Sequence, residues 1–322
     1  MADNTTRDQI AREVNNYYDR NLLMRALPLL VHTKFAQVRD IPANSGTNTI
    51  KFRRYGTLTA ATSALTEGTT PAGSQASVTD ITASVAQYGD FITYTDVVSY
   101  ETPDPVLTEF SDILGEQAGN TLDQLTRDVL AAGSTVQYVG AVSRVTIASD
   151  DLITATEVKK AVRTLKNANA RRVTSMIGAS TNVATEPVAP AYIGFVSPST
   201  WYDLQDETGW VPVEKYAANT KVLEGEVGKL GDVRFIESTN AKVFADAGAS
   251  SIDVHATIIV GAQAYGITRI SGQALRNIVK PLGSAGSADP LEQRGTTGWK
   301  ATFVAKILND DFLVRIEHAV TA

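Results

Sequence analysis

A long stretch without lysine or arginine runs from Gly56 to Gly89, although the sequence on either side of it has an ordinary globular composition. Its centre, LTEGTTPAGSQASVTD at residues 65–80, is rich in Thr, Ser, Ala and Gly, and its only charges are Glu67 and Asp80. Such a segment has too little apolar surface to offset the entropy cost of ordering itself. It is therefore a disordered linker, a lid over a substrate, or an arm that contacts another molecule.

The segments that flank this stretch are predicted to be strands. NTIKFRRYG at 48–56 alternates Ile50 and Phe52 with Lys51 and Arg53, which is the period of two typical of a half-buried strand. The segments ITASVAQYG and FITYTDVV, which follow, are rich in β-branched and aromatic residues. We expect an extended hairpin whose two strands flank a long loop.

The most regular element is a helix predicted over residues 102–133. Asp104 is the expected N-cap, Pro105 the first helical residue and Gly133 the stop. At 1.5 Å per residue, this helix is about 40 Å long. Its expected apolar stripe consists of Val106, Phe110, Ile113, Leu114, Gln117, Leu122, Leu125 and Val129.

The remainder of the chain is predicted to mix short strands and helices. Residues 5–27 have helical spacing and stop before Pro28, and a further helix is expected at 154–172. The inward positions expected in that second helix are Val158, Ala161, Val162 and Leu165. The segment 296–319 is predicted to be a hairpin that turns at Asn309-Asp310-Asp311. The alternation from 135 to 280 indicates a mixed α/β unit, which makes the whole chain α+β.

Bulk composition limits the functional classes. At 322 residues with 43% hydrophobic and 20% charged residues, the chain folds into two or three compact units. A net charge of -6 argues against tight, sequence-reading nucleic-acid binding. The absence of cysteine excludes disulfides, thiolate metal sites and a cysteine nucleophile, and it is consistent with folding in the cytoplasm. No secretory signal pattern or membrane-spanning apolar run is present in the sequence.

Motifs for catalysis and cofactor binding are weak. His32, His255 and His318 are far apart in sequence, so core or surface roles are expected for them. GEVGKLG at 225–231 lacks the residues of a phosphate-binding loop and is predicted to be a turn before a strand at 232–237. No G-x-S-x-G elbow is present in the sequence. We therefore predict no catalytic, cofactor-binding or metal-ligating residues, and no cofactor.

Four polar segments leave alternatives open. The acid pairs at 150–151 and 310–311 are candidates for a divalent cation, but cap and turn roles are favoured. The loop at 280–300 is predicted to be an interface or a domain connection rather than a lid. The helix at 154–172 has a basic face that would meet DNA, RNA or an acidic partner, or that is simply solvated. That face consists of Lys159, Lys160, Arg163, Lys166, Arg171 and Arg172.

The order of the predicted elements resembles the major capsid proteins of tailed bacteriophages, which have the Hong Kong 97-type fold. More narrowly, LTEGTTPAGSQ, QYGDFITYTD, GAQAYGITRI and PLGSAGSADPLEQRGTTGWKATFVAKILND are similar to the coat proteins grouped with that of the phage N-four. The likeness runs from about residue 20 to 318, and the last of these segments is the most specific.

This resemblance implies a division of the chain. Residues 1–45 would be the N-terminal arm and 46–95 the extended loop. Residues 96–149 would contain the long spine helix of a peripheral domain, and 150–280 would form an axial domain. Residues 281–322 would return to the peripheral domain.

The resemblance also implies a function: self-assembly into the pentamers and hexamers of an icosahedral head that encloses double-stranded DNA. The protein would be part of the virion and would assemble in the host cytoplasm. Its main partner would be itself, with decoration, scaffolding and portal proteins as further partners. Packaged DNA would lie close by without tight binding, and no membrane would be involved.

The expected contacts with neighbouring subunits lie on two surfaces. In the loop they are Glu67, Thr69, Thr70, Pro71, Ser74 and Asp80, and on the basic helix they are Lys159, Lys160, Arg163, Arg171 and Arg172. The acidic loop residues would contact basic residues of a neighbour, with the face at 159–172 as one candidate. Because the loop has no lysine, the covalent cross-link that some relatives form from it is not expected. The long N-terminal extension that some relatives use as a scaffold is also missing, so a separate scaffolding protein is expected.

Two other functions remain as alternatives. The first is a nanocompartment shell of the same fold, which would hold a protein cargo in place of a genome. The second is an α/β enzyme that uses the loop at 57–87 as a lid.

Overall fold

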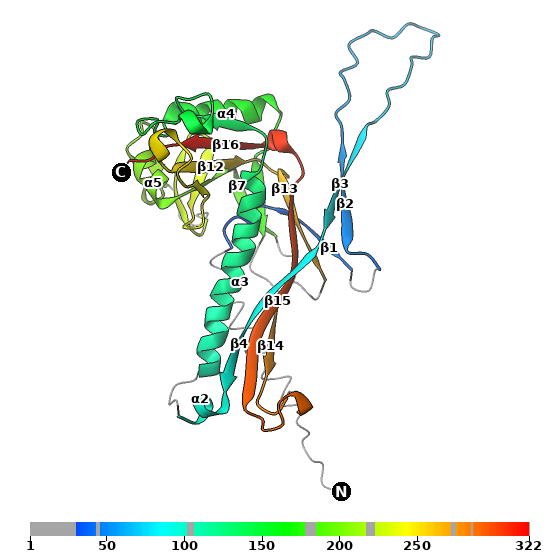
Figure 1. Cartoon of the computed structure of the whole chain (residues 1–322). Helices are drawn as coiled ribbons and strands as arrows, with labels where there is room; N and C mark the ends of the chain where they lie inside the picture. The colour runs from blue at the N-terminus through cyan, green and yellow to red at the C-terminus, as the bar shows by residue number, and fades with distance from the viewer. Residues whose placement is uncertain are drawn as a thin grey trace.

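Two sheets and one long helix organise the chain (Figure 1). The computed structural model describes residues 30–42, 46–101, 106–177, 185–216, 223–271, 275–284 and 286–321. The helix predicted at 5–27 and the caps predicted at Asp104 and Pro105 lie outside these residues.

The first sheet is long and narrow and is built around β15 (Arg294–Ile307). β4 (Ala86–Thr95) and β14 (Leu275–Lys280) flank the first half of β15 on its two sides, and both are antiparallel to it. β13 (Tyr265–Ile270) pairs with its second half, and β1 (Gln37–Ile41) adds to β13 in parallel. We call this the long sheet.

The helix α3 (Val106–Ala131) covers one face of the long sheet. Leu114, Ala118 and Leu122 of α3 pack against Trp299, Ala301 and Phe303 of β15. With 26 residues the helix is about 39 Å long, so the prediction of a long helix at 102–133 is confirmed. The predicted stripe is wrong at Ile113, which is 55% exposed, and at Gln117, which is also exposed. A short helix, α2 (Asp96–Glu101), precedes α3.

The second sheet is compact and has nine strands in the order β5-β16-β12-β7-β10-β9-β8, with β11 beside β12 and β6 beside β7. Its strands are β5 (Val136–Tyr138), β6 (Val173–Ile177), β7 (Thr185–Val196), β8 (Trp210–Pro212), β9 (Glu226–Leu230), β10 (Val233–Glu237), β11 (Val243–Phe244), β12 (Val254–Val260) and β16 (Leu313–His318). Short 3-10 helices occur at η2 (Arg144–Thr146), η3 (Val213–Lys215), η5 (Ala249–Ser251), η6 (Gly286–Ala288) and η7 (Asp310–Phe312).

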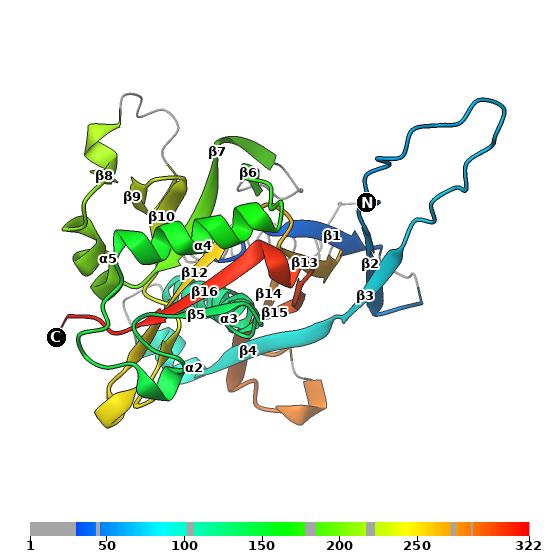
Figure 2. The same ribbon diagram turned by 90° about the horizontal axis from the view of Figure 1, so that it is seen from above.

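Two helices accompany the compact sheet, α4 (Ala155–Asn167) and α5 (Pro198–Gln205). Thr154 caps α4, because its side chain accepts from the backbone N–H of Glu157 at 3.4 Å. The four predicted inward residues of α4 are all buried in the same core as Tyr192, Phe235 and Ile316, which confirms that prediction. Figure 2 shows α4 lying across the sheet.

The predicted hairpin at 296–319 is wrong, although both of its strands exist. β15 pairs within the long sheet, whereas β16 pairs with β12 and β5 in the compact sheet. The two strands diverge because η7 replaces a tight two-residue turn, with the Asn309 side chain accepting from the Asp311 N–H at 3.3 Å. Conversely, β13 and β14 come before residue 280 in the chain, yet they pair with β15.

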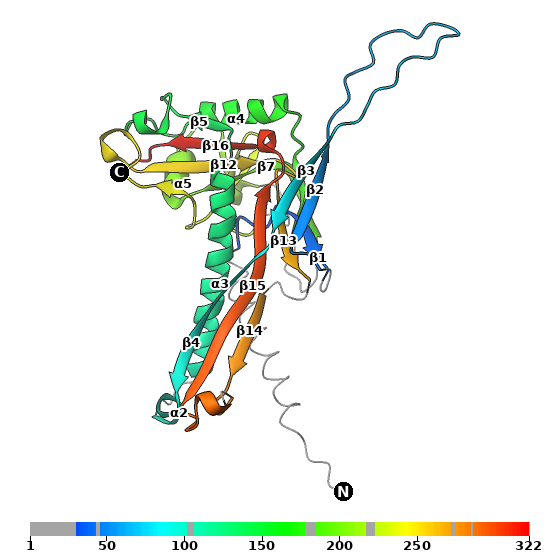
Figure 3. The same ribbon diagram turned by 45° about the vertical axis from the view of Figure 1, so that its right-hand side comes forward.

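The predicted hairpin around the stretch without lysine or arginine is confirmed, but FITYTDVV lies in β4, which pairs with β15, and at the start of α2. β2 (Thr49–Tyr55) and β3 (Val78–Ser84) are antiparallel, with Thr49 opposite Ser84 and Tyr55 opposite Val78. The base of the hairpin is fixed by a small apolar cluster that joins Phe52 to Leu308. We call β2, β3 and the loop between them the arm, and Figure 3 shows it projecting away from both sheets.

A buried ionic junction connects α3 to the compact sheet. Arg315 on β16 donates to the carbonyl oxygens of Ala131 and Gly133, and so caps the C-terminal end of α3. Glu317 accepts from Arg315 Nε at 2.7 Å and from two nitrogens of Arg144, each at 2.7 Å. The Glu317 side chain is fully buried, so the two guanidinium groups compensate its charge.

Candidate functional site

The loop of the arm has few contacts with its own chain. Every residue from Arg53 to Asp80 is exposed. The backbone N–H of Gly56 donates to Ser77 at the base of the loop, and that of Thr69 donates to Thr66 near its tip. β2 ends at Tyr55 and β3 begins at Val78, next to the Gly56–Ser77 hydrogen bond. The 57–76 backbone between the two strands therefore lies in solvent or against another molecule.

Five of the six loop residues predicted from the sequence lie in this loop, between β2 and β3. Glu67, Thr69, Thr70, Pro71 and Ser74 are exposed. The sequence reasoning missed two apolar residues beside them. Leu58 is 58% exposed and Leu65 is 78% exposed. Two exposed leucines and one carboxylate are therefore the most distinctive groups that the loop offers to a partner.

Asp80 differs from the other predicted loop residues because it lies on β3 and has partners within the arm. Its carboxylate is 3.4 Å from Arg53 Nε and 3.9 Å from Lys51 Nζ. These partners follow from the register, which places Asp80 directly opposite Arg53. The stretch from Gly56 to Gly89 contains two acids, Glu67 and Asp80. Of these two, Glu67 is the one without an ion-pair partner in the described part of the chain.

The basic face of α4 and the segment after it is partly neutralised within the chain. Lys160 pairs with Glu157 at 2.6 Å, and Arg172 pairs with Asp232 at 3.0 Å. Lys166 also pairs with Asp232, and its hydrogen bond lowers the pKa of that carboxyl. Three of the basic residues are exposed and have no ion-pair partner among the residues described: Lys159, Arg163 and Arg171.

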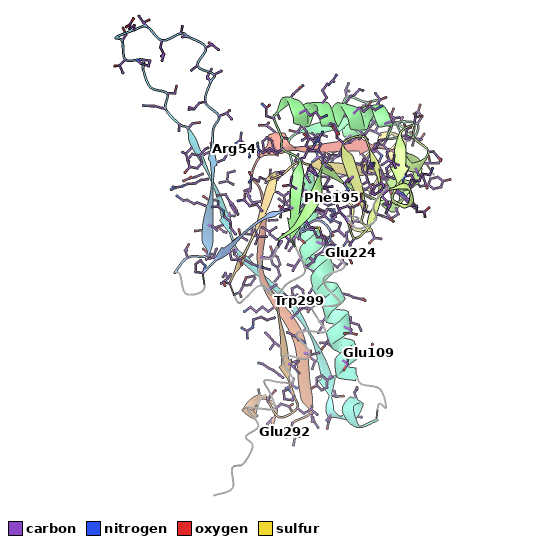
Figure 4. All side chains as sticks on the ribbon, turned by 180° about the vertical axis from the view of Figure 1, so that it is seen from behind. Arg54, Glu109, Phe195, Glu224, Glu292 and Trp299 are labelled. Atoms are coloured by element: carbon purple, nitrogen blue, oxygen red, sulfur yellow. The ribbon has the colours of Figure 1, made fainter. Side chains whose placement is uncertain are left out.

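Of the loop predicted at 280–300, residues 281–293 connect β14 to β15 at the far end of the long sheet, and residues 294–300 already belong to β15. Figure 4 shows Glu292 there, away from Phe195 in the compact sheet. The loop contacts the start of α2, because Asp96 N–H donates to the carbonyl of Gln293 at 3.1 Å. Leu291 in the loop is 75% exposed and Val97 in α2 is 51% exposed. This end of the molecule therefore presents apolar side chains to the outside.

The histidines have structural contacts, as predicted. The backbone N–H and the Nδ1 atom of His32 contact the two carboxylate oxygens of Asp123 at 2.7 and 2.8 Å. His318 lies 3.0 Å from the Thr257 hydroxyl, and burial lowers its pKa to about 4. His255 lies 2.9 Å from the Ser197 hydroxyl, and burial also lowers its pKa.

The Ser197–His255 contact resembles a nucleophile and its base, but Ser197 has another role. Its hydroxyl caps α5 and accepts from the Thr200 N–H at 3.2 Å. Ser197 is also only 7% exposed, which leaves little room for a substrate to reach it. This serine therefore stabilises a helix end.

The acid pairs also have the structural roles that were favoured. Asp151 accepts from the Ala148 N–H at 2.8 Å, and Asp310 accepts from the Ser134 N–H at 3.3 Å. Within the described residues, no three His, Asp or Glu side chains converge as metal ligands would. None of the described helices combines the length and apolarity needed to cross a membrane.

Comparison with protein families gives one match over most of the chain. A family described as phage capsid protein matches residues 32–280. A search of curated protein sequences found no match.

Solved structures with the same fold were found at low sequence identity. The capsid of Ralstonia phage GP4 is similar, with 15% identity and a TM-score of 0.66 over 88% of this chain and 87% of that one. The capsid of the cyanophage P-SCSP1u has 16% identity and a TM-score of 0.63 over 91% and 89%. A virus-like particle from Pyrococcus furiosus has 12% identity and a TM-score of 0.51 over 94% and 99%.

Proposed function

The chain belongs to the phage capsid protein family, and on this premise we propose that its copies assemble into the pentamers and hexamers of an icosahedral head around double-stranded DNA. The protein is then a part of the virion that assembles in the host cytoplasm. Its role is structural and not enzymatic, in keeping with its family. The fold that it shares with phage capsids supports this proposal.

The observation that carries the proposal is the arm. An ordered protein rarely projects a long segment whose residues are all exposed, because such a segment loses chain entropy without burying apolar surface. Contact with a second copy supplies the missing burial. A contact between an arm and a different surface of the next copy is heterologous, and heterologous contacts build rings when the rotation closes.

The two sheets support the division of the chain into functional parts. The long sheet with α3 forms the peripheral domain, and the compact sheet with α4 and α5 forms the axial domain around the symmetry axes. Residues 1–45 act as the N-terminal arm and 46–95 as the extended loop, although β1 and β4 at the ends of these ranges pair within the long sheet. The boundaries at 150 and 280 are approximate, because β5 and β16 belong with the compact sheet and β13 and β14 with the long one.

The remaining partners follow from charge and assembly. The exposed loop residues and the exposed basic residues of α4 contact neighbouring subunits. The net charge of -6 keeps the packaged DNA from binding tightly to the shell. Separate scaffolding, portal and decoration proteins complete the particle.

A shell without a genome is the second candidate function. The likeness to a virus-like particle from Pyrococcus furiosus favours it, because the same fold forms that particle. The family match over residues 32–280 favours the phage head over this alternative and over an enzyme with a lid.

Electron microscopy of the purified protein, combined with the 260/280 nm absorbance ratio, tests the proposal. We expect closed shells, and shells purified from infected cells should contain DNA. Shells with protein cargo would favour the second candidate, and a protein that stays monomeric under all assembly conditions would contradict both. Deletion of residues 60–85 is expected to abolish assembly, with circular dichroism as the control for folding.

A further inference from the structure

The arm is attached to the rest of the subunit through one face of its hairpin. Ile50, Phe52 and Arg54 share that face of β2, because side chains alternate along a strand. Arg53 lies on the opposite face. Ile50 and Phe52 pack in a small apolar cluster with Leu308, the residue that directly follows β15. This cluster fixes the base of the arm.

The apolar contact is confined to the base. Gly266 on β13 lies under Phe52, and a Cβ atom there would lie 3.2 Å from Phe52 Cε1 and 3.1 Å from Leu308 Cδ1. The missing side chain lets the Phe52 ring approach the long sheet closely. Farther out along the hairpin, the residues from 53 to 80 are all exposed. A contact at the base alone leaves this outer part free to tilt.

Arg54 supplies a second contact, farther out. It lies two residues beyond Phe52, about 7 Å along the strand. Its Nη1 atom donates to Asn309 Oδ1 at 2.6 Å, and its Nη2 atom is 3.8 Å from the carboxylate of Asp311. Among the described residues from 53 to 80, Arg54 is the one with a hydrogen bond outside the arm. Figure 4 shows Arg54 on the arm, at the side nearer the compact sheet.

Both partners of Arg54 belong to η7, which is held on three sides. The Asn309 N–H donates to the carbonyl oxygen of Ala264, next to β13, at 3.0 Å. Asp310 accepts from the N–H of Ser134, just after α3, at 3.3 Å. The carbonyl oxygen of Phe312 accepts from the N–H of the residue that follows β12, at 2.8 Å. A side chain that bonds to η7 is therefore connected to both sheets and to α3.

We propose that Arg54 is a positioning residue that sets the direction in which the arm leaves the subunit. Phe52 fixes one point of the arm on the long sheet, and Arg54 fixes a second point on η7. Two separated points define a direction, whereas one point acts as a pivot. The inference concerns the free subunit, and only its consequence for assembly rests on the proposed function.

The length of the arm magnifies any change at its base. Residues 56–77 run out and back, so about eleven residues extend in each direction and span about 35 Å when extended. A tilt of about 10° at the base displaces the tip by about 6 Å over that length. A small change at Arg54 therefore alters which surface the tip can reach.

The chain offers a matched control in the residue next to Arg54. Arg53 has the same chemistry and a similarly exposed side chain, 62% against 49% for Arg54. Its ion pair with Asp80, at 3.4 Å, stays within the arm. A change at Arg53 thus removes the same charge without affecting the connection to η7.

Pulsed electron spin resonance measures the direction of the arm, because the natural chain has no cysteine and two introduced thiols carry the only labels. We place them with Val78→Cys, at the outer end of β3, and Arg163→Cys, on α4; both positions are exposed. The unassembled subunit should give one narrow distribution of distances. Arg54→Ala should broaden it by about 4 Å, which a tilt of about 25° produces over the roughly 10 Å from Phe52 to Val78.

The companion variants decide the interpretation. Arg54→Lys keeps a charged donor and should keep the distribution narrow, and Arg53→Ala should leave it unchanged. Arg54→Met keeps the length of the side chain without its donors, and it replaces Arg54→Ala if circular dichroism shows that the latter is unfolded. An unchanged distribution without the guanidinium of Arg54, or equal broadening by Arg53→Ala, would overturn the inference.

Removal of the partner on η7 gives an independent test. Asn309→Ala should broaden the distribution as much as Arg54→Ala does, and the double variant should broaden it no further, because both changes break the same contact. Additive broadening in the double variant would show that the two residues act separately, which contradicts the inference.

Assembly gives a separate measurement, by light scattering. Arg54→Ala should lengthen the half-time of shell formation about threefold, because subunits with a freely tilting arm must order it on binding. Arg53→Ala should not lengthen it, and equal half-times in the two variants would reject a role for the direction of the arm in assembly. If the unmodified protein forms no shells, the proposed function fails, and the spin-label distances still decide the inference.

Discussion

At the scale of single residues, buried charges define the most sensitive positions. Glu317 is fully buried and depends on Arg144 and Arg315 for compensation. Arg315 also satisfies the last carbonyl groups of α3, so it links α3 to the compact sheet as well as balancing a charge. Removal of one partner from such a group costs much more than the loss of an exposed ion pair.

Arg315→Ala is therefore expected to destabilise the subunit by about 3 kcal/mol, because Glu317 and the end of α3 lose a buried donor. Denaturant unfolding of the unassembled subunit measures the change. Arg163→Ala serves as the control, and its effect should stay within about 0.5 kcal/mol because Arg163 is exposed. Equal stabilities of the two variants would show that the junction contributes nothing.

His318 makes stability depend on pH. Burial lowers its pKa to about 4, whereas the unfolded chain has a value of about 6.5. The unfolded state therefore binds the proton more readily, so stability is complete above about pH 6.5 and falls as the pH drops toward 4. Unfolding followed between pH 7 and 4 should show this loss, and His318→Gln should show a smaller one. An unchanged slope in the variant would assign the loss to other groups.

Single residues also show what the sequence predicts and what it does not. The inward residues of α4 follow from helical spacing alone. Asp123 of α3 was not predicted to be buried, because its partner His32 is 91 positions away in the chain. The exposure of Ile113 could not be predicted either. Helical spacing shows which residues share an apolar stripe, but it does not show how much of that stripe the sheet covers.

At the scale of elements, the arm is well specified by its sequence, because the alternation in β2 and the absence of lysine and arginine after it predict strands around a loop. The turn before a strand at 232–237 was predicted, but the strand β9 that precedes it was missed. The residues of GEVGKLG form β9 and then a two-residue Gly231-Asp232 link, with Gly231 at a φ of 60°. The strand β9 could not be recognised from its sequence, because EVGKL mixes charged residues and a glycine with only two apolar residues.

Proteolysis tests whether the loop lies open before assembly. Trypsin cannot cut between Arg54 and Arg127, because no lysine or arginine occurs between them. Proteinase K is expected to cut unassembled subunits first between residues 57 and 76, since these have almost no backbone hydrogen bonds within the chain. Mass spectrometry locates the cut. Assembled shells should resist it, and equal cleavage of shells and subunits would show that the loop has no partner.

At the scale of the whole molecule, the order of elements was predictable and their grouping into sheets was not. Strand segments can be recognised locally, but pairing depends on contacts between distant parts of the chain. β15 and β16 are consecutive, and a short turn between two strands ordinarily indicates a hairpin. Here the ionic junction and η7 direct β16 into the other sheet.

The shell is expected to hold without covalent bonds between subunits. The loop has no lysine and the chain has no cysteine, so neither an amide from the loop nor a disulfide joins the copies. Unmodified shells boiled in detergent should give a single band of one subunit. A ladder of higher bands from unmodified shells would contradict this expectation.

β15 and β16 make both sheets depend on one short segment of the chain. β15 is flanked by β4 and β14 in the long sheet, and β16 lies between β5 and β12 in the compact sheet. Both sheets thus receive an interior strand from residues 294–318, which follow every other described strand along the chain. A chain broken before residue 294 completes neither sheet, because each sheet lacks the strand that its neighbours pair with. Such a fragment is expected to lack the surfaces that subunits of the proposed shell would bind.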